Sequence, residues 1–91
     1  MSTTTIGTTS KGQRVWIQGL GALGWPTGTR YNVHYTTAAI VVVQSPTGKR
    51  AVSKGKGGII DLVGKRVTQW AQGATSATVV YNHAIIEIEV A

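Results

Sequence analysis

The stretch GALGWPTGTRYNVHY, residues 21–35, joins two different sequence patterns. Before Pro26 the apolar residues are separated by glycines, and the three glycines within residues 19–24 cost about 1 kcal/mol each in a helix, which allows only one or two helical turns. Pro26 and Gly28 then favour a turn, because proline fixes φ and glycine adopts left-handed conformations readily. Beyond the turn, apolar and polar residues alternate over residues 30–35, which predicts a strand.

Further strands are predicted on both sides of this stretch. Residues 39–44, AIVVVQ, form a β-branched run typical of a buried strand, and the short TTA turn before it makes a β-hairpin with residues 30–35. Upstream, RVWIQ places Val15 and Ile17 on one face of a short strand. The order is therefore strand, short helix, glycine turn, strand, turn and strand.

The second half of the chain repeats this order. GIIDL, residues 58–62, predicts a strand, and LVGKRVTQWAQ, residues 62–72, predicts a helix with Asp61 as its N-cap. A glycine turn and a second alternating hairpin, residues 74–90, follow. Residues 25–28 (WPTG) align with residues 70–73 (WAQG), each before a strand, a turn and a strand.

Because one such unit cannot close a core alone, two units are expected to form one small barrel. The predicted fold class is mainly β with one or two short helices, in one domain. The segments are a flexible Ser/Thr-rich tail over residues 1–11, a first hairpin repeat over 12–44, a basic linker over 45–57 and a second repeat over 58–91.

Composition limits the chemistry and suggests the partner. The chain has no cysteine, which excludes disulfides and thiolate metal sites and suits a cytoplasmic protein. Its apolar runs fall well short of the roughly 20 residues that span a bilayer, so no membrane partner is expected. Nine Lys and Arg against three Asp and Glu give a net charge of +6, which points to nucleic acid, although many basic proteins bind none.

Most of the basic residues cluster in and just after the linker. We expect these side chains to contact the phosphate backbone, with two further arginines from the first repeat as second choices. The alternative is that a lysine-rich linker only aids solubility. The nucleic-acid-binding candidates are Lys49, Arg50, Lys54, Lys56, Lys65 and Arg66, followed by Arg14 and Arg30.

Little in the sequence predicts catalysis. The three carboxylates are interpreted as the helix cap Asp61 and the solvated strand residues Glu87 and Glu89, so no catalytic residue, metal or cofactor is assigned. His34 and His83 could serve a metal-independent ribonuclease, but nothing in their spacing demands it. Whether the protein is an enzyme is therefore left open.

Three tryptophans could stack on bases. Trp25 and Trp70 occupy matching positions of the two repeats, which favours packing in the core. Trp16 lies on the opposite strand face from Val15 and Ile17 and is the most exposed candidate.

Residues 15–43, VWIQGLGALGWPTGTRYNVHYTTAAIVVV, resemble the swapped-hairpin unit of the AbrB/MazE superfamily and are most similar to SymE-like toxins. The matching elements are the strand 15–17, the short helix 20–25, the glycine turn 28–29 and the strands 31–35 and 39–43. The resemblance covers residues 14–43 and extends more loosely to 58–90.

Two departures from the family pattern stand out. The usual acidic residue after the turn glycine is replaced by Thr29 and Ala74, and the unit normally occurs once per chain and dimerises. The duplicated unit here implies an intrachain pseudo-dimer, or a homodimer or higher homo-oligomer of such chains.

Three functions remain open. The resemblance implies a nucleic-acid ligand, and together with the charge it favours a duplex DNA-binding transcriptional regulator or antitoxin-like protein. A SymE-like toxin acting on RNA is the second hypothesis. The third is a non-catalytic assembly or inhibitor protein of a mobile element, whose positive face meets an acidic protein.

Overall fold

The computed structural model describes residues 2–91. Strands dominate this part of the chain, with one 3-10 helix and one α-helix between them. In chain order the elements are β1 (Ser2–Thr9), β2 (Gly12–Ile17), η1 (Leu20–Leu23), β3 (Arg30–Tyr35), β4 (Ala39–Gln44), β5 (Arg50–Ala51), β6 (Ile60–Val63), α1 (Lys65–Ala71), β7 (Ser76–Asn82) and β8 (Ile85–Val90).

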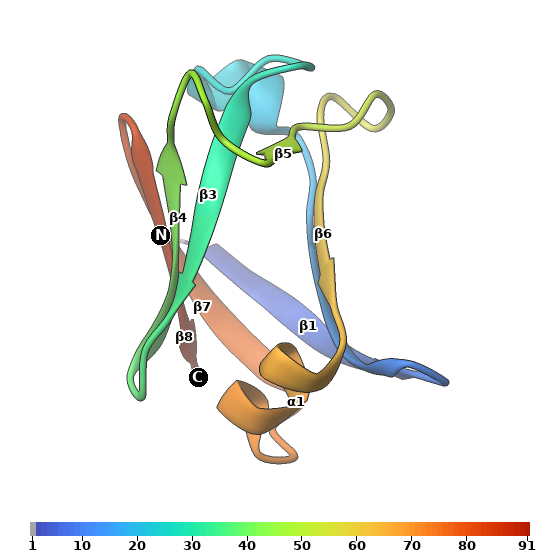
Figure 1. Cartoon of the computed structure of the whole chain (residues 1–91). Helices are drawn as coiled ribbons and strands as arrows, with labels where there is room; N and C mark the ends of the chain where they lie inside the picture. The colour runs from blue at the N-terminus through green and yellow to red at the C-terminus, as the bar shows by residue number, and fades with distance from the viewer. Residues whose placement is uncertain (1) are drawn as a thin grey trace.

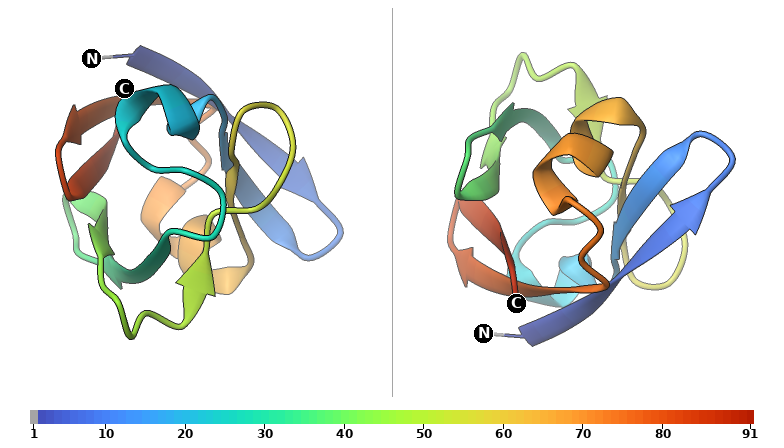
Figure 2. Two further views of the ribbon diagram at one scale, coloured as in Figure 1. Left: turned by 90° about the horizontal axis from the view of Figure 1, so that it is seen from above. Right: turned by 90° about the horizontal axis from the view of Figure 1, so that it is seen from below.

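The eight strands form one curled sheet in the order β5-β3-β4-β8-β7-β1-β2-β6, and every neighbouring pair is antiparallel (Figure 1). Seen from its two ends, the sheet is a nearly closed barrel, with η1 lying at one end and α1 at the other (Figure 2). The predicted fold class, a mainly β barrel with short helices, is confirmed. In residues 2–91 no helix combines the length and the hydropathy that a membrane crossing requires.

The barrel interior is filled by the alternating apolar residues of the strands. In β8, Ile86 and Ile88 are fully buried whereas Glu87 and Glu89 are exposed, as the period-2 pattern predicts. Each such isoleucine contributes about 1.5–3 kcal/mol relative to an exposed one. Val90, which the same alternation predicts to point inward, is 41% exposed because it lies at the end of the strand.

The two halves have the same element order and pair with each other. β2-η1-β3-β4 is followed by β6-α1-β7-β8, so the strand, helix, strand, strand unit occurs twice. The first strands of the two units pair, with Val15 opposite Leu62, and so do the last strands, with Val42 opposite Ile86. All four of these side chains are fully buried, so the core is shared between the units.

The repeat extends further towards the N-terminus than predicted. The N–H of Ile6, in β1, donates to the carbonyl of Thr75 at 2.9 Å, and the N–H of Val52, just after β5, donates to Thr29 at 2.9 Å. The two donors, Ile6 and Val52, are 46 residues apart along the chain, and so are the two acceptors, Thr29 and Thr75. Both donor side chains are apolar and buried. β1 and β5 are therefore equivalent elements of the two units.

The expected flexible tail over residues 1–11 is consequently wrong for residues 2–9. Four residues of β1, Ser2 to Thr5, pair with β7, and the next four pair with β2. Threonine favours strands because its branched side chain suits a pleated surface, so pairing on two edges and burial of Ile6 suffice to order this polar segment.

One local expectation in the second half is also corrected. The helix begins at Lys65 after Gly64, so Asp61 is not its cap. Asp61 lies inside β6 opposite Trp16, because β6 continues the pairing with β2 as far as Val63. The basic linker, residues 45–57, contains the short strand β5.

Replacing Ile6 by alanine should test the role of β1. The side chain is 3% exposed, so Ile6→Ala is expected to lower the free energy of unfolding by about 2–5 kcal/mol, measured by urea denaturation. Thr5→Ala, at an exposed position of the same strand, is the matched control and should change it by about 0.5 kcal/mol or less. Equal, small effects of both substitutions would show that β1 is not part of the folded core.

Candidate functional site

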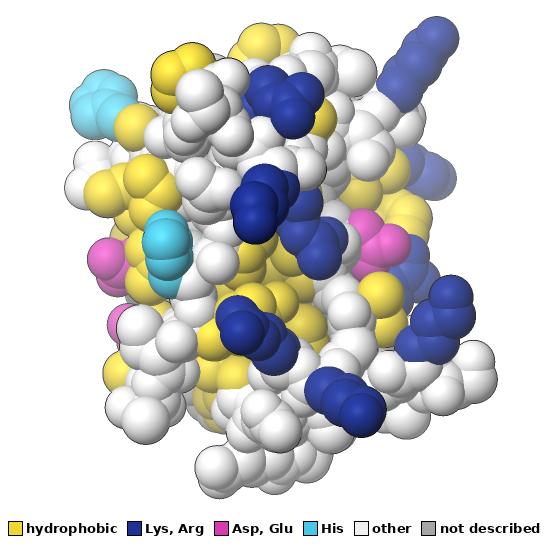
Figure 3. All heavy atoms as spheres, viewed as in Figure 1, with side chains coloured by type: hydrophobic (Ala, Val, Ile, Leu, Met, Phe, Trp, Pro, Cys, Tyr) yellow, Lys and Arg dark blue, Asp and Glu magenta, His cyan; other side chains and the backbone are white. Residues whose placement is uncertain are grey.

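A cleft of about 420 Å³ opens between β3 and β6, the two sides of the barrel that do not pair. We call it the basic groove. In Figure 3 Lys and Arg side chains surround an apolar surface on the face of the molecule that carries β3 and β6 in Figure 1. The residues that line the groove are Tyr31, Asn32, Val33 and Tyr35 of β3, Lys49 and Arg50 at β5, Val63 of β6, and Lys65 and Arg66 at the start of α1.

The groove exists because β5 is short. β5 pairs with β3 only at Arg30 and Tyr31. Gly48 packs so closely on Tyr31 that a Cβ atom there would lie 2.5 Å from the Tyr31 backbone nitrogen. At the next residue, the N–H of Lys49 donates to the Asn32 side chain at 3.3 Å instead of continuing the strand ladder. The rest of β3 therefore has no strand partner on this side within residues 2–91.

Two of the four cations of the groove, Arg50 and Arg66, act on its two tyrosines. The Arg66 guanidinium carbon is 5.6 Å from the centre of the Tyr35 ring, within the range of a cation–π contact. Burial raises the pKa of both Tyr31 and Tyr35, and the negative charge of Asp61 adds to the rise for Tyr31. The positive charge of Arg50 opposes the rise in each pKa, and that of Arg66 opposes it for Tyr35. None of the described residues lining the groove is an Asp or Glu.

The groove continues along the side of α1. A second cleft of about 560 Å³ shares Tyr35 and Arg66 with it and adds Gln69, Trp70 and Gln72. The two clefts together offer cationic, amide and aromatic groups along one path. Such a path suits an extended polyanion better than a compact small molecule.

The structure brings together half of the sequence-predicted binding residues. Lys49, Arg50, Lys65 and Arg66 meet in the basic groove although they come from two separate segments. Lys54 and Lys56 lie in the exposed loop between β5 and β6 and do not line it.

Arg30 lies elsewhere and is engaged with the backbone. Its Nε donates to the carbonyl of Gly48 at 2.8 Å, and the side chain lines a different cleft with Gln44 and Pro46. Its guanidinium thus braces the turn before β5.

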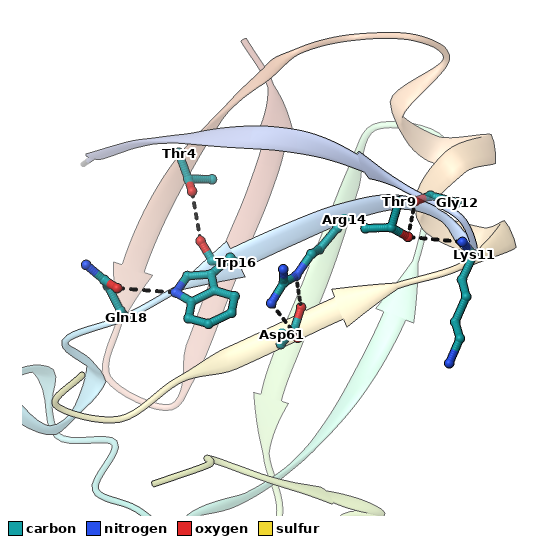
Figure 4. Close-up of polar contacts among 8 residues, drawn as sticks. All are labelled: Thr4, Thr9, Lys11, Gly12, Arg14, Trp16, Gln18 and Asp61. Carbon is teal, nitrogen blue, oxygen red and sulfur yellow. Dashed lines mark hydrogen bonds and ion pairs between the residues drawn. The ribbon is translucent and has the colours of Figure 1, made fainter. Parts of the chain in front are cut away.

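Arg14 is paired with Asp61 on the outer face of β2 and β6 (Figure 4). Its Nε and Nη2 donate to the two carboxylate oxygens at 2.8 and 3.0 Å, and this hydrogen bonding raises the pKa of Arg14. The guanidinium also covers the ring of Trp16 at 4.2 Å. An arginine and a tryptophan that the sequence suggested as nucleic-acid contacts are therefore already in contact with each other.

The histidines are not assembled into a catalytic pair. His34 is exposed on β3, and His83 is in the turn between β7 and β8, where its carbonyl accepts a hydrogen bond from Trp25 Nε1 at 2.8 Å. Figure 3 shows the histidine side chains as two separate groups. Throughout residues 2–91, no three His, Asp or Glu side chains are placed to hold a metal ion.

Sequence reasoning missed the uncharged part of the groove, namely Tyr31, Asn32, Val33, Tyr35 and Val63. The alternation places Tyr31, Val33 and Tyr35 on one strand face, which is the correct face. Nothing in that pattern indicates that the neighbouring strand ends after two residues and leaves Val33 and Tyr35 half-exposed.

No protein-family model, curated protein or solved structure matches the chain. The resemblance to the AbrB/MazE superfamily and to SymE-like toxins therefore stays a hypothesis.

Tyr31 should make stability depend on pH in the alkaline range. Because burial raises its pKa in the folded protein above the ordinary value near 10, the folded state holds this proton more tightly. Its stabilising contribution is fully present below about pH 10 and is lost as pH rises through the folded-state pKa. The unfolding free energy of the wild type should thus fall more steeply above about pH 10 than that of Tyr31→Phe, measured by urea denaturation. Parallel pH profiles would contradict this expectation.

Proposed function

We propose that the protein binds nucleic acid through the basic groove. The observation that carries this proposal is that four of the nine Lys and Arg residues meet in one groove, while none of its described lining residues is acidic. Cations that neutralise phosphates release condensed counterions, which provides sequence-independent affinity.

The four side chains are suited to phosphate contact. Lys49, Arg50, Lys65 and Arg66 have long, exposed side chains. Arg14 differs, because its guanidinium is held by Asp61. Lys65 and Arg66 lie in the first turn of α1, on the opposite wall of the groove from β3. A phosphate backbone lying in the groove would therefore be contacted from both walls.

Duplex DNA is the first ligand to test, with a regulator or antitoxin-like role for the protein. Phosphate contacts would position the duplex, and polar residues such as Asn32 at the groove could contact base edges. The resemblance to swapped-hairpin proteins points to the same ligand class. RNA and single-stranded DNA are the comparison ligands, because half-exposed Tyr35 offers an aromatic ring beside the cations.

A binding titration over a range of salt concentrations tests the proposal. If about four phosphates are contacted, the logarithm of the association constant should fall with the logarithm of salt concentration with a slope of about −3.6 for duplex DNA. The double variant Lys65→Glu with Arg66→Glu should weaken binding by about 10-fold or more and make the slope shallower. Fluorescence anisotropy with labelled duplex DNA, single-stranded DNA and RNA of equal length measures both quantities.

The matched control is Lys54→Glu with Lys56→Glu. It changes the net charge by the same amount but alters lysines that do not line the groove. Its binding should fall much less than that of the groove variant. Equal losses would indicate attraction by net charge alone, and absence of binding to all three ligands at low salt would rule the proposal out.

A further inference from the structure

The two units of the barrel differ in the length of the N-terminal strand that each of them adds, β1 in the first unit and β5 in the second. β1 has eight residues and pairs with β7 as far as Ser2 opposite Val79. Its equivalent β5 has two residues and stops at Arg50 opposite Tyr31. On β3, the positions equivalent to the last paired residues of β7 are Asn32 and Val33, and they have no strand partner on this side within residues 2–91. The second unit therefore lacks a strand segment that the first one has.

The backbone of β3 is oriented to accept such a segment. The Arg30 carbonyl accepts from Ser45 N–H, and Thr36 N–H donates to the Ala39 carbonyl, so even-numbered residues direct their backbone groups towards β4 and its flanking turns. Backbone N–H and carbonyl groups point to alternate edges along an antiparallel strand. Val33 and Tyr35 therefore direct their backbone groups to the edge of β3 away from β4, into the basic groove. An extended chain lying there could form main-chain hydrogen bonds with both residues.

The groove also indicates the chemistry of the missing segment. Lys49, Arg50, Lys65 and Arg66 surround it, which favours acidic side chains on the occupant. Val33, Val63 and Tyr35 provide apolar surface between these cations, which favours apolar residues at alternate positions. An extended peptide with alternating acidic and apolar residues matches both features.

The described part of the chain contains no free segment of this kind. Glu87 and Glu89 lie in β8, which is paired on both edges by β4 and β7. Asp61 is bound by Arg14. The occupant is therefore expected to come from another protein.

We propose that the open edge of β3 binds an extended acidic segment of a partner protein by strand addition, starting in the place where the first unit has Ser2 and Thr3 of β1. This interaction goes beyond the proposed function because it uses the backbone edge of β3 as well as the cations. If the bound segment also displaces nucleic acid from the cations that both would contact, it would regulate nucleic-acid binding. Only this regulatory part of the proposal rests on the proposed function.

A peptide of about six residues in which Glu and Val alternate is the probe. Two variants of the peptide carry backbone N-methyl groups, one at its odd-numbered residues and the other at its even-numbered residues. Both keep the charge and the side chains of the unmodified peptide. The unmodified peptide is expected to bind, and at least one N-methylated variant should bind about 10-fold or more weakly because it loses the hydrogen bonds to β3. Anisotropy measures the affinities without any change to the protein.

Amide hydrogen exchange locates the peptide. Exchange at Val33 and Tyr35 should slow on binding, whereas Asn32 and His34, which face β4, should change little. Binding that is equal for all three peptides, or that leaves Val33 and Tyr35 exchange unchanged, would show that charge alone attracts the peptide and would overturn the proposal.

A labelled duplex DNA, added in a separate arm, separates the two proposals. If DNA binds but the peptide does not, strand addition is wrong and the proposed function stands. If the peptide binds in a backbone-dependent way and no nucleic acid binds, the proposed function is wrong and strand addition stands. Where both bind, displacement of the DNA by the peptide supports regulation, and simultaneous binding excludes it.

Discussion

Pairing between the two halves of the chain is the constraint on which the structure depends. β2 pairs with β6 and β4 pairs with β8, so each half supplies part of the sheet that covers the other half's core. Ile40 opposite Ile88 and Val42 opposite Ile86 are fully buried only because both halves are present. A single half would expose this apolar face to water, so the two units are expected to fold as one cooperative unit.

Much of the fold could be predicted because its strands alternate in polarity. The hairpins β3–β4 and β7–β8 follow directly from that alternation, and the repeat of element order predicted a barrel. β1 was missed because its composition is polar, with Ile6 as its one large buried side chain. Its order comes from pairing with β7 and β2, a tertiary effect that local composition does not show. Asp61 was misassigned for a similar reason, since its partner Arg14 is distant in sequence.

The candidate site was only partly predictable. Charge composition identified the cations, but the run of basic residues from 49 to 56 suggested one patch, whereas the structure divides it. Lys49 and Arg50 meet Lys65 and Arg66 because β6 returns along the barrel to start α1 beside β3. Lys54 and Lys56 sit in a separate loop. The contribution of Tyr35 depends on where β5 ends, and that is set by the close packing of Gly48 on Tyr31.

The open edge of β3 also bears on how copies of this protein behave at high concentration. Unpaired strand edges are templates for edge-to-edge association and aggregation, and soluble proteins commonly guard them with charged side chains. Lys49 and Arg50 flank this edge, with no acidic residue among the described lining residues to neutralise them. Two molecules that met through this edge would bring their like charges together at short range. The same cations that define the groove therefore hinder self-association through it, and this protection weakens as salt screens the charges.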